Sequence, residues 1–246
     1  MDIRIETLES VESTNSYLSA RAAKIDYPLM VVAREQTAGR GQRGNSWESE
    51  PGKNLTFSIL VRLSDFPARK QFAISEAVAL AIRDALAGFG LEAKVKWPND
   101  IYVGDRKICG ILIEHAIMGA NLMHTIIGAG INVNQRVFRS PAPNPVSMSQ
   151  ILNRDVPLDE LRDSVASKIG EALGNLSGES FRRSVHSEFC GSLWRGDGEC
   201  HRFRDTASGE CFDAAIASVD PEGPITLRRD DGKESTYFFK QVEFIL

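Results

Sequence analysis

Residues that would direct this sequence to a metal-binding or disulfide-rich class are scarce. The 246 residues include four cysteines, and no two of them form a C-x-x-C pair. Cys200 and His201 are the only Cys–His neighbours, and in a strand they would point to opposite faces. We therefore expect reduced structural thiols rather than a zinc site or a disulfide framework.

Basic charge and long apolar runs are also lacking. Lys and Arg number 29 against 33 Asp and Glu, a net charge of -4, so no general basic field exists to hold a nucleic-acid backbone. No stretch approaches the ~18 apolar residues of a membrane span. The first residues, MDIRIETLES, lack the basic and apolar regions of a signal peptide. The sequence predicts a cytoplasmic protein that binds neither membrane nor nucleic acid.

The chain does have enough apolar residues, 42%, to bury one large or two smaller cores. Ser13, Thr14 and Asn15 carry side-chain oxygens suited to capping a helix that runs to Arg21 or beyond. Apolar residues at three-to-four spacing predict longer helices over 71–88 and 158–176. Strands are predicted at 3–7, 29–33, 55–61, 95–97, 101–103, 108–114 and 124–134.

The pattern changes in the C-terminal half. Prolines at positions 141, 143, 145 and 157 predict an irregular crossing over residues 137–157. After about residue 190, short strand-like segments are broken by SGE, PEG and DDG turns, which is typical of a small β-barrel. We predict an α+β fold, with a mixed sheet and packed helices over residues 1–190 and a barrel over residues 191–246.

Residues 39–47, GRGQRGNSW, form a flexible cationic segment. It is not a P-loop, because Asn45 stands where the Lys should be and a strand-like run follows instead of a helix. Its glycines let the backbone fold closely over a ligand while Arg40 and Arg43 reach anionic groups. The alternative is a solvated surface loop. Trp47 fits no core pattern, so stacking on a planar ligand is a reasonable use of it.

Two further segments combine charge with a constrained backbone. KWPND, residues 96–100, crowds an aromatic ring, an amide and a carboxylate at a strand end, although Asn99 and Asp100 can equally be ordinary turn formers. Lys107 enters the apolar run ICGILIE, where Gly110 leaves room for a ligand beside the ammonium group. The alternative is an edge-strand lysine that deters aggregation.

The segment IIGAGINVN, residues 126–134, is similar to a dinucleotide-binding fingerprint but does not complete it. Val133 occupies the position of the third glycine, and no helix or ribose-binding acid follows. What remains is a strand in which Gly128 and Gly130 allow close packing. Its Asn132 offers an amide able to read a base or a ribose.

In this order and spacing, the segments resemble the biotin protein ligases. The match runs over nearly the whole chain: STN at 13–15, Gln36, GRGxRGxxW, KWPNDIY, RKICGILIE, IGAGINVN and a small C-terminal barrel. Each motif alone is weak, but together they are highly specific. The resemblance implies a catalytic domain like those of class II aminoacyl-tRNA synthetases, of the biotin/lipoate ligase type, followed by an SH3-like barrel.

The resemblance also implies an activity. Such enzymes use ATP with Mg²⁺ to convert biotin to biotinyl-5'-AMP, then transfer biotin to a lysine of the biotin carboxyl carrier domain of a carboxylase. The matching biotin-binding residues are Ser13, Thr14, Asn15, Gln36, Gly39, Arg40 and Gly110. Those matching the ATP and adenylate site are Arg43, Trp47, Asn99, Asp100, Lys107 and Asn132. Lys107 and Arg40 are the catalytic candidates, because cations neutralise charge building on phosphorus, and Asp100 is the candidate for the metal region.

The sequence departs from the family pattern at two points. Gln42 stands where many relatives carry Arg, so either Arg43 or Lys53 compensates or the adenylate is held less firmly. The chain also opens directly on the expected catalytic strand, without room for a winged-helix domain, and we expect no operator DNA binding.

Two other functions are alternatives to a biotin protein ligase. A lipoate ligase or octanoyltransferase would share the fold, but its R-R-x-S-G-G-G type of loop is missing. An RNA-binding module is disfavoured by the acidic balance and the lack of interleaved aromatics. The oligomeric state does not follow from the sequence.

Overall fold

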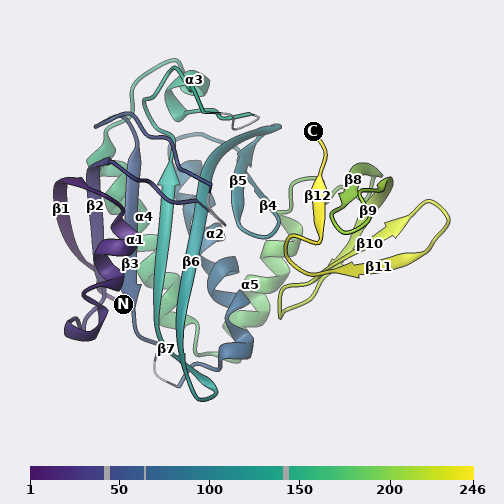
Figure 1. Cartoon of the computed structure of the whole chain (residues 1–246), viewed down its shortest axis with the longest axis horizontal. Coiled ribbons are helices and arrows are strands. Elements are labelled where there is room, and N and C mark those ends of the chain that lie inside the picture. The colour runs from purple at the N-terminus through teal and green to yellow at the C-terminus, as the bar shows by residue number, and fades with distance from the viewer. Residues whose placement is uncertain (42–44, 64, 141–143) are drawn as a thin grey trace.

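The fold is built on a seven-stranded mixed sheet in the order β1-β2-β3-β7-β6-β5-β4 (Figure 1). The computed structural model describes residues 1–41, 45–63, 65–140 and 144–246. β1 and β2 are parallel, and the other neighbouring strands are antiparallel. The strands are β1 (Arg4–Val11), β2 (Leu29–Gln36), β3 (Leu55–Val61), β4 (Lys94–Lys96), β5 (Asp100–Val103), β6 (Arg106–Met118) and β7 (Asn121–Ile131).

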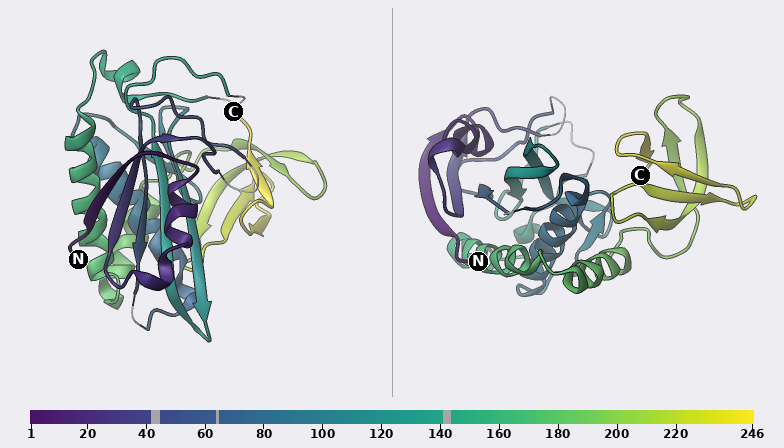
Figure 2. Two further views of the ribbon diagram at one scale, coloured as in Figure 1. Left: turned by 60° about the vertical axis from the view of Figure 1, so that its left-hand side comes forward. Right: turned by 90° about the horizontal axis from the view of Figure 1, so that it is seen from below.

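Helices cover both faces of this sheet. Figure 2 shows α2 (Phe72–Ala87) and α4 (Leu158–Asn175) on one face, with α5 (Glu179–Gly191) beside α2. The short α1 (Thr14–Ser19) packs against β2, β3 and β7 on the other face. Side chains alternate along a strand, so Ile59 of β3 joins the core under the long helices while Leu60 joins a second core with Leu18 of α1.

Several helix boundaries differ from those predicted. The first helix ends at Ser19, before Arg21, and the side chain of its N-cap residue Ser13 makes no capping hydrogen bond. The segment 137–157 is not wholly irregular, because it contains α3 (Met148–Leu152), which begins with a capping box between Ser147 and Gln150. α5 was not predicted at all, although Phe181, Val185 and Phe189 stand four residues apart within it.

The strands agree in position, and β3 also agrees in length, but others differ in their bounds. β6 continues four residues past the predicted end at 114 to Met118, and β7 starts at Asn121 instead of 124. After Ile131 the chain leaves the sheet, so Asn132 lies just beyond the end of β7. The two long strands form a hairpin whose outer end extends past the helices (Figure 1).

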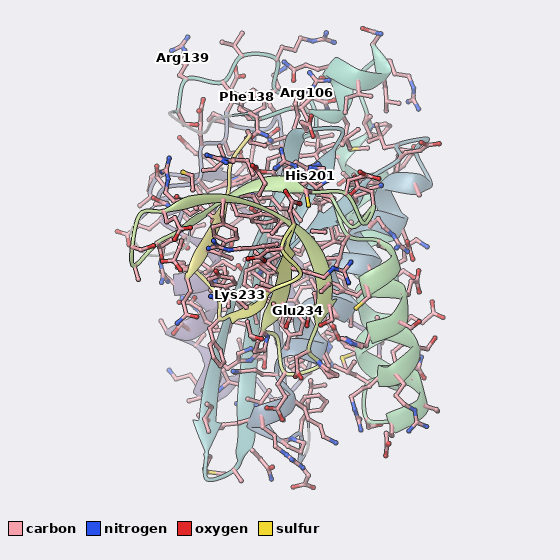
Figure 3. All side chains as sticks on the ribbon, turned by 90° about the vertical axis from the view of Figure 1, so that its right-hand side faces the viewer. Arg106, Phe138, Arg139, His201, Lys233 and Glu234 are labelled. Atoms are coloured by element: carbon pink, nitrogen blue, oxygen red, sulfur yellow. The ribbon has the colours of Figure 1, made fainter. Side chains whose placement is uncertain are left out.

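The predicted C-terminal barrel is a separate five-stranded antiparallel sheet in the order β11-β10-β9-β8-β12. Its strands are β8 (His201–Asp205), β9 (Cys211–Val219), β10 (Ile225–Arg229), β11 (Glu234–Tyr237) and β12 (Val242–Phe244). Figure 3 looks onto this sheet, with His201 on β8 and Lys233 and Glu234 at the turn into β11.

Aromatic side chains join the barrel to the large sheet. Tyr102 of β5 packs against Trp194, and Trp194 packs against Phe244 of β12. The Trp97 indole donates a hydrogen bond to the Gly223 carbonyl at 2.9 Å and meets the Phe239 ring edge-on. Helices in the described part of the chain are all too short or too polar to span a membrane.

Candidate active site

A cavity of about 490 Å³ opens on the face of the sheet that carries α1. It extends from the start of α1, over the ends of β6 and β7, to the barrel, which contributes Phe239. Most residues predicted from the sequence line it: Ser13, Thr14, Asn15, Gln36, Arg40, Trp47, Asn99, Asp100, Lys107, Gly110 and Asn132. The structure therefore brings together segments more than 100 residues apart in the chain.

Among the described residues, one predicted residue, Gly39, does not line the cavity. An added Cβ at Gly39 would meet the Trp47 carbonyl oxygen at 2.6 Å. Glycine is needed at position 39 because any side chain would prevent this close approach of two backbone segments. Arg43 lies outside the described residues, as does Gln42, so the role of neither is tested.

A chain of hydrogen bonds supports the α1 end of the cavity. The Gln36 side-chain oxygen accepts hydrogen bonds from the Thr14 backbone N–H at 2.8 Å and the Thr14 hydroxyl at 3.1 Å. Ser58 lies 2.6 Å from that hydroxyl and donates to the Asn15 side-chain oxygen at 2.5 Å. The Asn15 amide donates in turn to Glu114 at 2.7 Å. These buried groups form a preorganised, almost uncharged surface for a polar ligand.

The floor beneath this network has almost no side chains. Gly128 pairs with Ser58 on one side and Leu112 on the other, and Gly130 pairs with Gly110. An added Cβ at Gly128 would collide with the Asn15 amide. The missing side chains make room for Asn15 and Trp47, which themselves line the cavity.

The two predicted catalytic cations are each held by a carboxylate. Lys107 donates from Nζ to Asp100 at 2.7 Å, and Arg40 donates from Nη2 to Glu114 at 2.8 Å. Both cations line the cavity, so an anionic ligand would compete with these carboxylates for them. β6 lies between β5 and β7, so the alternative reading of Lys107 as an edge-strand lysine is wrong.

Trp47 lies over the glycines of the floor. Its ring approaches Gly110 so closely that an added Cβ would meet it at 2.8 Å, and a Cβ at Gly130 would collide with the indole. The Lys107 ammonium is 5.9 Å from the ring centre. The indole N–H is buried and has no partner among the described residues. Trp47 is thus placed in the cavity, as predicted, with a free donor.

Two buried asparagines donate hydrogen bonds from the side-chain nitrogen, while the side-chain oxygen of each has no partner among the described residues. Asn132 donates from Nδ2 to the Val146 carbonyl at 3.1 Å, and Asn99 donates to the Ile111 carbonyl at 3.2 Å. The side-chain oxygens of both asparagines are buried and make no hydrogen bond to described residues. Buried acceptors of this kind are normally paired, so a ligand donor fits here. Asn99 does lie in the turn between β4 and β5, as the alternative reading held, but it is only 7% exposed and lines the cavity.

Sequence reasoning missed several lining residues. Gly128 was expected only to allow close packing, and its place opposite Ser58, beside α1, is what makes it a lining residue. Phe239 comes from the barrel, which carried no signal of a site.

Lys96 lies within a recognised motif, and burial, partly offset by Asp100, lowers its pKa. Burial likewise raises the pKa of Tyr102, whose hydroxyl is 3.3 Å from Lys96 Nζ, to about 12.

The described residues offer no activated nucleophile or protein-built metal cage. Cys109 is fully buried, and burial raises the pKa of its thiol far above the ordinary value, so it stays protonated. None of the cysteines forms a disulfide, as expected. Within residues 1–41, 45–63, 65–140 and 144–246, no three His, Cys, Asp or Glu side chains are grouped to hold a metal.

Comparisons with known proteins agree on one family. Residues 7–132, which are 126 of the 246, match the model of the biotin/lipoate A/B protein ligase family. The bifunctional ligase/repressor BirA of Escherichia coli is 37% identical over 133 residues, covering 54% of this chain and 41% of that protein. The biotin–[acetyl-CoA-carboxylase] ligase of Paracoccus denitrificans is 31% identical over 166 residues, 65% of this chain and 68% of that protein. The chain thus spans less than half the length of the E. coli relative.

The fold leads to the same group of proteins. Biotin protein ligase from Aquifex aeolicus, solved in complex with biotin and ATP, superposes with a TM-score of 0.79 over 98% of this chain and 97% of the other, at 23% identity. This likeness confirms the predicted α+β architecture of a mixed catalytic sheet followed by a small SH3-like barrel. Because the family model covers the segments that build the cavity, and because the whole chain shares the fold, the protein belongs to the biotin/lipoate A/B protein ligase family.

Proposed function

We propose that this protein is an ATP-dependent biotin protein ligase. One observation carries the proposal: a single cavity is lined at α1 by the hydrogen-bonding side chains of Thr14 and Asn15 and elsewhere by Trp47, Asn132 and Lys107. The relatives support it, since two are named as ligases and the Aquifex protein was solved with biotin and ATP. We assign the reaction to residues 1–190 and regard residues 191–246 as a barrel domain that completes the cavity.

Biotin suits the α1 end of the cavity. Its cyclic urea both donates and accepts hydrogen bonds, and Thr14 and Asn15, which are hydrogen-bonded to Ser58, present hydroxyl and amide groups that do the same. Ser13, Gln36, Gly39, Arg40 and Gly110 complete this set in our assignment, although Gly39 does not itself line the cavity. The glycine floor lets Asn15 and Trp47 lie close against the sheet on either side of this end.

The nucleotide suits the other end. Trp47 offers a ring face for adenine, and the unpaired oxygen of Asn132 can accept from the exocyclic amine of the base. Asn99 and Asp100 lie near the start of β5, where we place the ribose and phosphates, and Arg43 belongs to this set by its motif.

The chemistry requires cations more than a nucleophile. In the first step the biotin carboxylate attacks the α-phosphorus and pyrophosphate leaves, so negative charge gathers between two anions. Lys107 lies in the cavity to stabilise it, with Arg40 near the biotin side. In the second step the amine of a carrier lysine attacks the mixed anhydride and AMP leaves. The acceptor we propose is the biotin carboxyl carrier domain of a carboxylase.

The residues present also fit a magnesium ion carried by ATP. Mg²⁺ is usually held by one or two carboxylates together with substrate phosphates, and Asp100 is the one carboxylate among the described residues lining the cavity. When bound, the ion would neutralise phosphate charge and favour departure of pyrophosphate. Asp100 would then give up its ion pair with Lys107 in order to bind the magnesium ion.

A substrate-dependence assay tests the proposal. We expect ATP–pyrophosphate exchange with biotin and none with lipoate, followed by transfer to a carrier domain that is detected with streptavidin. Lys107→Met should lower the exchange rate by about 100-fold. Exchange that depends on lipoate instead of biotin would replace this function with that of a lipoate ligase.

A further inference from the structure

Two segments far apart in the chain form facing walls of the nucleotide end of the cavity. One contains Ser46 and Trp47, and the other contains Ser140, Asn144 and Pro145 beyond the end of β7. Each segment is mostly free of regular secondary structure, although an isolated β-bridge anchors each one, between Arg40 and Ser46 in the first and between Lys107 and Pro145 in the second. Neither bridge links one wall to the other.

Glu48, next to Trp47, connects the two walls. Its Oε1 accepts a hydrogen bond from the Arg139 backbone N–H at 2.9 Å, and its Oε2 accepts one from the Ser140 N–H at 2.5 Å. Although partial burial opposes it, these backbone donors lower the pKa of Glu48, so the carboxylate stays charged at neutral pH. The contact involves only the backbone of Arg139, whose side chain points away from the molecule in Figure 3.

Gln135 strengthens this connection through three further hydrogen bonds. Its Nε2 donates to Glu48 Oε1 at 3.1 Å, and its Oε1 accepts from the Glu50 N–H at 2.9 Å and from Asn54 at 2.6 Å. The side chain is almost completely buried. We call Glu48, Gln135 and the two backbone N–H groups of residues 139 and 140 the clasp.

We propose that Glu48 is a positioning residue, which through the clasp holds Trp47 against the nucleotide end of the cavity and so slows the escape of an acyl-adenylate. The indole of Trp47 lies over Gly110 and Gly130, and Ser140 lies on the facing wall. Opening the clasp would remove a direct connection between the segment that follows Trp47 and Ser140. This role rests on the proposed function, because it needs an activated intermediate that is worth retaining.

The first arm of the test measures the clasp itself in the ligand-free protein. Amide hydrogen exchange of Arg139 and Ser140, followed by NMR, should be about tenfold faster or more in Glu48→Gln, since a neutral amide has only one acceptor oxygen and bonds more weakly. Glu50→Gln is the matched control, because the exposed side chain of Glu50 lies outside the clasp. Unchanged protection in Glu48→Gln would overturn the proposal.

The second arm measures retention of the intermediate. Labelled adenylate formed on the enzyme and chased with unlabelled biotin should dissociate about tenfold faster from Glu48→Gln and from Gln135→Ala, with the double variant no faster than either. Unchanged release despite faster exchange would make Glu48 merely structural. If the wild-type protein forms no adenylate, the proposed function fails, while the exchange arm still decides whether the clasp exists.

Discussion

At the scale of single residues, an absent side chain shapes the site as much as any that is present. Gly128 is directly opposite Ser58 in the sheet, and its missing Cβ is what lets the Asn15 amide reach both Ser58 and Glu114. The sequence indicated that Gly128 allows close packing, but not which side chain packs against it. Gly128 and Asn15 are 113 positions apart, and only the pairing of β3 with β7 brings them together.

Gly128→Ala tests this role. The new methyl group would push the Asn15 amide out of the network, so we expect the KM for biotin to rise about tenfold or more. Overpacking should also cost about 1 to 3 kcal/mol of stability. Gly191→Ala is the control, because a Cβ there meets nothing within 4 Å. An unchanged KM for biotin in Gly128→Ala would show that Asn15 has no part in binding.

At the scale of elements, the contact between α2 and α5 contains a buried polar pair. Glu76 of α2 is 1% exposed and lies 2.7 Å from His186 Nδ1 of α5. Cys190, one turn further along α5, lies 3.8 Å from the other ring nitrogen. Burial outweighs the neighbouring His186 and raises the pKa of Glu76 from 4.5 to about 7. This interface was unforeseen, because α5 itself was not predicted.

The raised pKa of Glu76 sets a direction for the pH dependence of stability. Between pH 4.5 and about 7, folded Glu76 keeps a proton that the unfolded chain has lost, so rising pH lowers the free energy of unfolding. Glu76→Gln removes this contribution, and its stability relative to the wild type should increase across that window. Urea unfolding at about pH 5 and about pH 8 measures the difference. Glu92→Gln, at an exposed site, should show no such trend.

At the scale of the whole molecule, the barrel is a structural part of the cavity. The Trp97 indole hydrogen-bonds to Gly223 of the barrel and contacts Phe239, and Phe239 lines the cavity. Trp97 immediately precedes the segment that carries Asn99 and Asp100. Trp97 therefore connects the barrel directly to a segment that lines the cavity.

Trp97→Phe should loosen this connection. It removes a buried hydrogen bond, which should cost about 1 to 3 kcal/mol of stability, and it lets Phe239 shift. We expect the KM for ATP to rise severalfold with a smaller change in kcat, measured by pyrophosphate exchange. Phe238→Ala, at the neighbouring exposed ring, should leave both constants unchanged. If the KM for ATP also stays unchanged in Trp97→Phe, the barrel does not act on the site through this contact.

The sequence by itself determined the fold class, the C-terminal barrel and most of the residues that line the cavity. Alternating and three-to-four apolar spacing is a local property, and motifs such as KWPND carry their chemistry in adjacent residues. Only the tertiary structure decided which residues meet. Strand pairing placed Ser58 beside Gly128, and docking of the barrel brought Phe239 to the cavity. Asp100 and Glu114 formed ion pairs with Lys107 and Arg40. Such contacts depend on register and packing between distant segments, which no local pattern encodes.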